Sequence, residues 1–532
     1  MLKRILALLI ALVMLIGLFT ACVSNNTKSS ENNMQSSQLT GNEGVQNDEE
    51  TLKVKRIRRG AIIDDIQEPT AFELKVKELF NIEFETTVFP EQDYEQKIIL
   101  LFTSGEIPEF IDIVNGYAGY SMEKLALEGF LIPLNDYLNK IPEYRKRFSS
   151  EADYEFTIKD ASIGGKLYYL PWPNYRTTPY GWIYKKVYLE QLGLEFPKTI
   201  DELLYVLAKV KEDKPEWAIP GRVDYGGLYR PTMGLFSAYR TANGWYIDPD
   251  ENNALTFGPI TDKYRELLKT ARYMYKQGYI HKEAETFSSE QYNNWMSQKK
   301  IAIMYTAVNQ INDNKPDEPE TEKYYYTDEY ITAYNDKPGL WSKEPPYFKY
   351  GPAIVEGTSQ EKIDRLIEFL KWMNTPAGYN FFFLGEEGVT FEYVNGKARF
   401  IGDYKKDETG IDYSDKFTKA GYGTALQMGY SVDFMNRVNM DPIIELSQKV
   451  AGKDNFFPVL SIKYTEQETK DRADISTLID DTVKQYFVRF IMDDKLDPAN
   501  DDHWKEYIDT LMKNGYERYA QITINAYNRT KQ

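Results

Sequence analysis

A polar segment early in the chain separates a short leader from a long body, and the length of that body constrains the fold most. Residues 23–50 are rich in Ser, Asn, Gln and Glu and carry hardly any large apolar side chain, so they cannot bury enough surface to fold. The body, residues 51–532, exceeds what one hydrophobic core usually supports. We therefore expect two lobes behind a flexible tether at residues 22–50.

The leader has the pattern of a secretory signal. A basic start, Lys3-Arg4, precedes an apolar run from Ile5 to Phe19, which is shorter than the roughly 20 residues of a spanning helix. The run ends at Thr20-Ala21-Cys22, and Cys22 is the single cysteine of the chain. A lone thiol in an exported chain cannot close an internal disulfide. The segment resembles the lipobox of bacterial lipoproteins, with Phe19 where leucine is usual. This predicts a signal peptide at residues 1–21 and lipidation (palmitate) at Cys22.

Charge and residue counts narrow the function classes. The formal net charge is −17, and it becomes −19 once Lys3 and Arg4 leave with the leader, so long-range repulsion disfavours nucleic acid and anionic ligands. Two histidines and one cysteine exclude a zinc site of the usual His and Cys kind. No glycine-rich phosphate loop is present, so we expect no cofactor and no ATPase activity in this chain.

The start of the body alternates strands and helices. Extended patterns at residues 51–63 and 82–88 flank a helical pattern at 71–80. A second helical pattern at 93–102 ends at Ser104-Gly105, and the apolar run at 110–114 indicates a buried strand. This order predicts an α/β fold with short, mostly buried strands.

Several segments, in this order, resemble family 1 extracellular solute-binding proteins. They are YEQKI with SGEIPEFID (94–98, 104–112), GGKLYYLP (164–171), WIYKKVYL with LGL and PKTIDEL (182–189, 192–194, 197–203), WMSQKKIAIM (295–304), GEEGV (385–389) and GYERY (515–519). The stretch from 182 to 203 is the most specific, and within it Thr199 with Glu202 predicts a capping box at a helix start. Length and tether match the long Gram-positive members of that family.

The resemblance implies a helix-rich, two-lobe periplasmic-binding-protein-like fold (type II) with the solute bound in an interlobe cleft. It places residues 51–170 in the first lobe, to which part of about 301–360 returns. Residues 171–300 and 361–532, with the C-terminal helices, form the second lobe. The implied function is that of a monomeric, lipid-anchored subunit on the extracellular face of the cell membrane. It would capture a carbohydrate and deliver it to ABC permease subunits served by a separate ATPase, without catalysis.

Aromatic residues are the candidate ligand contacts, because aromatic faces grip the apolar faces of sugar rings and make up 14% of the chain. Four of them lie within eleven residues at the expected crossover, among prolines, where helical core spacing cannot explain them. We expect ligand contacts from Trp172, Tyr175, Tyr180, Trp182, Trp245, Tyr305, Asn309 and Tyr117. Trp217, Trp295 and Trp372 are predicted to be packing residues.

Three alternatives stay open at this stage. A lipid-anchored glycoside hydrolase needs only two carboxylates at a fixed separation, and carboxylates are plentiful. A peptide receptor could use the same fold. Asp248-Pro249-Asp250-Glu251-Asn252 has oxygen ligands at alternate positions, as a calcium loop does. It lacks that loop's glycine and its final glutamate, so we expect no metal and instead a turn between two strands at Asn252-Asn253.

Overall fold

The computed structural model describes residues 50–59, 69–90, 94–115, 125–174, 179–223, 226–315, 317–406, 408, 410, 413–423, 441–450 and 453–530. Residues 50–532 form one compact unit. The predicted signal peptide, Cys22 and the tether up to residue 49 lie outside the described residues. No helix among those described is long and apolar enough to cross a membrane.

The first lobe is built on a sheet with strand order β2-β1-β3-β9. Its strands are β1 (Leu52–Arg59), β2 (Ile82–Phe89), β3 (Phe110–Asn115) and β9 (Tyr350–Ile354). β1 runs parallel to β2 and β3, whereas β9 is antiparallel to β3. The helices of this lobe are α1 (Ala71–Phe80), α2 (Tyr94–Ser104), α4 (Pro142–Arg145), α5 (Glu151–Ala161), α11 (Gln360–Met373), α12 (Pro376–Leu384) and α13 (Asp415–Lys419). A hairpin of β10 (Phe391–Val394) and β11 (Lys397–Phe400) also packs here.

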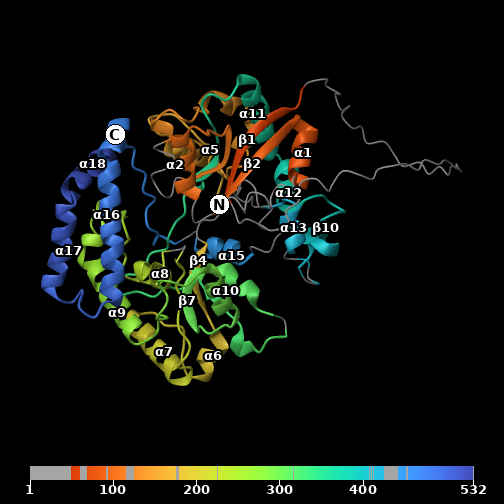
Figure 1. Cartoon of the computed structure of the whole chain (residues 1–532). Coiled ribbons are helices and arrows are strands. Elements are labelled where there is room, and N and C mark those ends of the chain that lie inside the picture. Colours follow the sequence, from red (N-terminus) through yellow and green to blue (C-terminus); the bar gives the residue numbers. More distant parts are fainter. Residues whose placement is uncertain are drawn as a thin grey trace, which may run out of the picture. The chain divides into compact units, whose positions relative to one another are not determined.

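The second lobe has a sheet with strand order β7-β4-β8 and a separate hairpin. Its strands are β4 (Tyr180–Tyr184), β5 (Trp245–Asp248), β6 (Ala254–Phe257), β7 (Ile303–Ala307) and β8 (Tyr325–Thr327). Its helices are α6 (Lys186–Gln191), α7 (Ile200–Asp213), α8 (Tyr229–Ala238), α9 (Asp262–Lys276), α10 (Ser289–Ser297), α15 (Asp441–Val450), α16 (Glu466–Met492), α17 (Asp501–Lys513) and α18 (Tyr516–Thr530). The three last helices pack together beside α9 (Figure 1).

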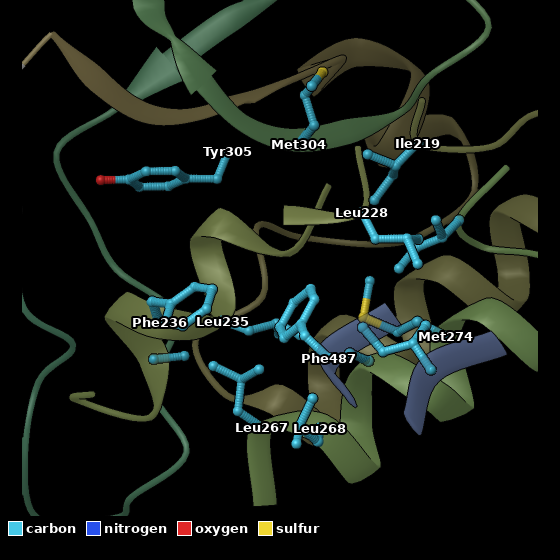
Figure 2. Close-up of a cluster of buried hydrophobic side chains, with 14 of the residues drawn as sticks. Ile219, Leu228, Leu235, Phe236, Leu267, Leu268, Met274, Met304, Tyr305 and Phe487 are labelled. Carbon is cyan, nitrogen blue, oxygen red and sulfur yellow. The ribbon is translucent and has the colours of Figure 1, made fainter. Parts of the chain in front are cut away.

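Each lobe has its own hydrophobic core. In the first, Phe369 of α11 makes edge contacts with the rings of Phe72, Phe84 and Phe110, at centroid distances of 5.7–6.3 Å. In the second, apolar residues of α8, α9, β7 and α16 meet, as Figure 2 shows for Phe236, Leu267, Met304 and Phe487 among others. The chain enters each core more than once, so the lobes are joined by several crossovers.

One part of the expected lobe division is wrong. Of the range 301–360, part of which was expected to return to the first lobe, the strand at 303–307 stays in the second lobe, because β7 pairs with β4 along its whole length in that lobe's sheet. The described residues between 360 and 422 do not belong to the second lobe, since the apolar face of α11 is buried against the first lobe's sheet. The return to the first lobe comes instead through β9, and from Asp441 onward the helices build the second lobe.

Local predictions from the sequence are confirmed at several places. The strand, helix and strand at the start of the body are β1, α1 and β2. α7 begins with the predicted capping box, in which Thr199 accepts from the backbone N–H of Glu202 and the Glu202 carboxylate accepts from that of Thr199. Asn252 and Asn253 have φ values of 55° and 57°, the left-handed conformation that a tight turn between β5 and β6 requires.

Candidate functional site: an aromatic cavity between the lobes

A cavity of about 350 Å³ lies where residues of the two lobes meet, and we call it the aromatic cavity. This volume is at the lower end of the range, roughly 300–1,000 Å³, typical of small-molecule sites. Its lining residues come from β4, β7, α8, the β5 region, α5 and two irregular segments. They are Asp160, Tyr180, Tyr229, Met233, Phe236, Ser237, Thr241, Ala242, Trp245, Tyr246, Tyr305, Leu340, Ser342, Lys343, Pro345, Lys349 and 457–460.

Paired strands provide one wall of the aromatic cavity. Side chains two residues apart on a strand share a face, so Tyr180 and Trp182 of β4 point to the same side, and Trp182 stands directly opposite Tyr305 of β7. The Trp182 and Tyr305 rings meet edge to face at 5.5 Å. Figure 2 shows the Tyr305 hydroxyl directed away from the labelled apolar cluster. Burial raises the pKa of Tyr305, so its hydroxyl stays protonated and able to donate a hydrogen bond at neutral pH.

α8 provides the neighbouring wall. Tyr229, Met233 and Phe236 are spaced at i, i+4 and i+7, which places them on one face of the helix, and all three line the cavity. The helix lies close to the sheet because residue 234 is glycine. A Cβ atom there would stand 2.5 Å from Cζ2 of Trp182 and 2.9 Å from Cβ of Tyr305. Gly234 therefore sets the spacing on which the shape of the cavity depends.

A third wall is formed by Trp245 and Tyr246 at the start of β5. The Trp245 ring packs against Phe257 and Tyr519, at 5.2 and 6.0 Å, yet it is only half-buried. Its position is thus fixed from behind while part of the indole faces the cavity. The Tyr246 hydroxyl donates to the buried carboxylate of Asp248 at 2.7 Å, which holds the ring in place.

Asp160, at the end of α5, is the first lobe's polar contribution. Its carboxylate accepts hydrogen bonds from the hydroxyls of Tyr347, at 2.6 Å, and Ser461, and its Oδ1 lies 3.3 Å from Nζ of Lys463. Burial alone would raise the pKa of Asp160, but the Lys463 charge, the two hydrogen bonds and the Lys349 charge outweigh it and lower that pKa. Asp160 is therefore ionised at neutral pH, with its charge largely compensated.

Two lysines line the cavity beside these rings. Lys343 and Lys349 lie on the segment that leads from the second lobe back to β9; the first is exposed and the second half-buried. Within the part of the chain that the structure describes, neither ammonium group forms an ion pair with a carboxylate inside 4.0 Å, and Lys349 acts on Asp160 only over a longer distance.

The predicted contact residues divide into three groups. Tyr180, Trp245 and Tyr305 line the aromatic cavity. Three others do not line it. Trp172 is 0% exposed in the core of the first lobe, and Trp182 is 4% exposed in the core of the second lobe. Asn309 lies half-buried in the 3-10 helix η4 (Val308–Asp313) and is not among the described lining residues. Tyr117 and Tyr175 fall outside the described residues. Of the predicted packing residues, Trp217 is buried, and Trp295 and Trp372 pack against the two cores.

The lining residues of α8 and the lysines were not predicted, and neither were Asp160 and Phe457. The spacing of Tyr229, Met233 and Phe236 is also that of an ordinary core face, so periodicity alone cannot reveal a cavity. Phe457-Pro458 interrupts a polar stretch, and Lys343 lies in a proline-containing connection. Such breaks in composition are signals that could have identified both segments as more than linkers.

In the loop Asp248–Asn252, the candidate calcium site, the carboxylates of Asp248 and Asp250 are paired with a lysine and an arginine of the same chain. Lys263 donates to both carboxylate oxygens of Asp248 and to Asp250, each at 2.9 Å. Arg240 forms a two-pronged ion pair with Asp250 at 2.8 and 2.9 Å. Among the described residues, no group of three or more His, Cys, Asp or Glu side chains is arranged to hold a metal ion.

Known proteins resemble this chain in structure or in sequence. The alginate-binding protein AlgQ2, in a crystal structure without calcium ion, superimposes with a TM-score of 0.71 at 18% identity, covering 90% of this chain and 98% of that one. The polygalacturonan/rhamnogalacturonan-binding protein YtcQ of Bacillus subtilis (strain 168) is 22% identical over 436 residues, 80% of this chain and 82% of that protein. The fructooligosaccharide ABC transporter substrate-binding protein FusA of Streptococcus pneumoniae (serotype 4, strain ATCC BAA-334 / TIGR4) is 25% identical over 232 residues, 41% of this chain and 42% of that protein.

The family description that matches this sequence is that of the bacterial extracellular solute-binding proteins, and the match covers residues 64–380, more than half of the chain. It contains β4, α8, β5 and β7, the elements that build most of the aromatic cavity. The sequence match identifies this family over more than half of the chain, and the two-lobe fold is consistent with it. The chain therefore belongs to the family of bacterial extracellular solute-binding proteins.

Proposed function

We propose that this solute-binding protein captures an oligosaccharide in the aromatic cavity. The observation that carries the proposal is the combination of aromatic rings with polar groups around one cavity of suitable size. Tyr180, Trp245 and Tyr305 offer faces on which the apolar side of a sugar ring can stack. Ser237, Thr241 and Ser342 offer hydroxyls that can both donate to and accept from sugar hydroxyls. A short oligosaccharide, or the end of a longer one, fits a volume of about 350 Å³.

The names of two relatives support a carbohydrate ligand and an importer as partner. YtcQ is named for binding polygalacturonan and rhamnogalacturonan, and FusA as the substrate-binding protein of a fructooligosaccharide ABC transporter. By analogy, this chain would deliver its sugar to membrane permease subunits energised by a separate ATPase. The expected affinity is micromolar, about −8 kcal/mol, which allows both capture and release.

The proposal includes a lipid anchor at Cys22 and a monomer on the extracellular face of the cell membrane. A diacylglyceryl group on Cys22 with a polar tether behind it would keep the binding unit near the permease. Mass spectrometry of the N-terminal peptide tests the anchor: the mature chain should begin at a lipid-modified Cys22. In the Cys22→Ala variant the modification should be lost and the protein released into the medium. An unmodified Cys22 on an uncleaved chain would contradict this part of the proposal.

Binding without catalysis is part of the same proposal. Hydrolysis of a glycosidic bond ordinarily uses two carboxyl groups on either side of the bond. Within the described part of the chain, one carboxylate lines the cavity, that of Asp160, and it is held by Tyr347, Ser461 and Lys463. A proton donor with a raised pKa would be expected in a hydrolase, whereas the pKa of Asp160 is lowered.

A thermal-shift screen tests the proposed function. The protein is heated with mono-, oligo- and polysaccharide fragments and with peptides, because a ligand that binds only the native state raises the melting temperature. We expect a rise with an oligosaccharide that mass spectrometry recovers intact after incubation. A cleaved sugar would identify an enzyme, and a rise with peptides alone would overturn the carbohydrate ligand.

A further inference from the structure

The charge balance inside the aromatic cavity differs from that of the whole chain. The chain carries −17, but the lining contains Lys343 and Lys349 against the single described carboxylate of Asp160. That carboxylate is already matched by Lys463 and by two hydroxyl donors. Lys349 also acts on this carboxylate over a longer distance, but among the described residues neither lining ammonium group lies within 4.0 Å of a carboxylate, so the described lining carries a net positive charge.

Because Lys343 is exposed and Lys349 half-buried, both ammonium groups reach solvent and remain able to pair with a charged ligand. The acidic residues elsewhere on the surface do little for these lysines, since charges separated by more than about 8 Å are largely screened at physiological ionic strength. The expectation from net charge, that anionic ligands are disfavoured, holds for long-range approach only. Close contacts inside the cavity decide which ligand is held, and these favour an anion.

The adjoining aromatic residues restrict the chemistry of that anion. Tyr180, Trp245 and Tyr305 suit a ligand with a flat apolar face rather than a free phosphate or a small inorganic ion. In a hexuronic acid the carboxylate projects from the edge of the ring and leaves the ring faces free. One sugar residue can therefore stack on an aromatic ring and present its charge to a lysine at the same time.

Resting on the proposed function, we infer that the aromatic cavity selects oligosaccharides that contain uronic acids, with Lys343 and Lys349 pairing with the ligand's carboxylates. The aromatic rings provide stacking that any sugar could use, and the lysines distinguish an acidic sugar from a neutral one. Lysine acts here as a charged, three-donor group on a flexible stem, which tolerates different positions of the carboxylate along the sugar chain.

The test is calorimetric titration of the full chain, purified in detergent, with trigalacturonate and with the methyl ester of the same trisaccharide. The ester keeps the rings, the linkage and the length but removes the charge. We expect the free acid to bind about tenfold more tightly than the ester, and its affinity to fall as salt is added. A sulfated disaccharide serves as a second anionic probe.

Lys343→Gln and Lys349→Gln should each weaken binding of the free acid several-fold and leave binding of the ester unchanged. Lys513→Gln, an exposed position at the end of α17 that does not line the cavity, is the control for the change in net charge. All three side chains are at least partly exposed, so the variants should fold.

The outcomes separate this inference from the proposed function. Equal affinity for acid and ester, or binding of neutral oligosaccharides alone, would overturn the uronate inference while the carbohydrate ligand stands. Tight binding of the sulfated disaccharide with no binding of trigalacturonate would also overturn it. If no sugar of any charge binds, the proposed function fails as well.

Discussion

The close approach of α8 to the β4–β7 sheet makes Gly234 the position at which the packing behind the aromatic cavity can be tested most sharply. In Gly234→Ala the new Cβ would stand 2.5 Å from Trp182 Cζ2, about an ångström inside ordinary contact. Trp182 is 4% exposed, so its ring has little free space into which it can move. Overpacking costs about 1–3 kcal/mol, and we place this site at the upper end. Alanine regains about 1 kcal/mol of helix propensity.

The net expectation is a loss of about 2 kcal/mol of unfolding free energy. For a cooperative unit of this lobe's size that corresponds to a fall in Tm of about 4–8 °C. Gly244→Ala is the matched control, because nothing lies within 4 Å of a Cβ there and its backbone needs no positive φ. Differential scanning calorimetry of both variants gives the two Tm values to be compared with that of the parent. A Gly234→Ala protein as stable as Gly244→Ala would refute the account of how helix and sheet meet.

Four further predictions concern the cavity, its supports and the loop that carries Asp248 and Asp250. Trp245→Ala should weaken oligosaccharide binding about 30-fold in calorimetry, since losing about 80 Å² of apolar contact costs about 2 kcal/mol; unchanged affinity would show that the indole does not touch the ligand. Because the folded pKa of Asp160 is lowered, its contribution to stability is present above its unfolded value, about 3.9, and is lost as pH falls through the folded pKa. The unfolding free energy of Asp160→Asn should therefore be lower than that of the parent at pH 7, and the difference between the two should shrink below pH 4. A difference in unfolding free energy that does not change with pH would contradict this. Lys263→Met should destabilise the protein by about 3–5 kcal/mol, because it leaves Asp248 and Asp250 buried with one cation fewer. The parent's Tm should be the same with EDTA as with calcium, and a calcium-dependent rise in the parent would show that this loop does bind the metal.

Local structure and the family were predictable from the sequence because short-range signals determine them. The capping box at Thr199 and the paired asparagines at 252–253 depend on neighbouring residues alone. The lobe assignment of α11 was not predictable in the same way. Its apolar face fits either core, and only the tertiary contact of Phe369 with Phe84 and Phe110 decides between them.

The proline-containing crossover shows why individual contact residues are difficult to predict. Trp172 pairs through its backbone with Tyr350 and Phe348, and its ring lies in the first core beneath the guanidinium of Arg147. Tyr180, eight residues later, is already on β4 and lines the cavity. A connection that passes from one core to the other places successive aromatic residues in different environments. The spacing of these residues in the sequence does not indicate where the environment changes.

The central claim is that an oligosaccharide occupies the aromatic cavity. The crystal structure of the protein with a sugar that raises its melting temperature tests it most directly. The account predicts a sugar ring against Trp245 or Tyr305, with hydroxyl groups of the ligand bonded to the polar residues of the same lining. A sugar bound elsewhere, with the aromatic cavity empty or filled by protein side chains, would contradict it.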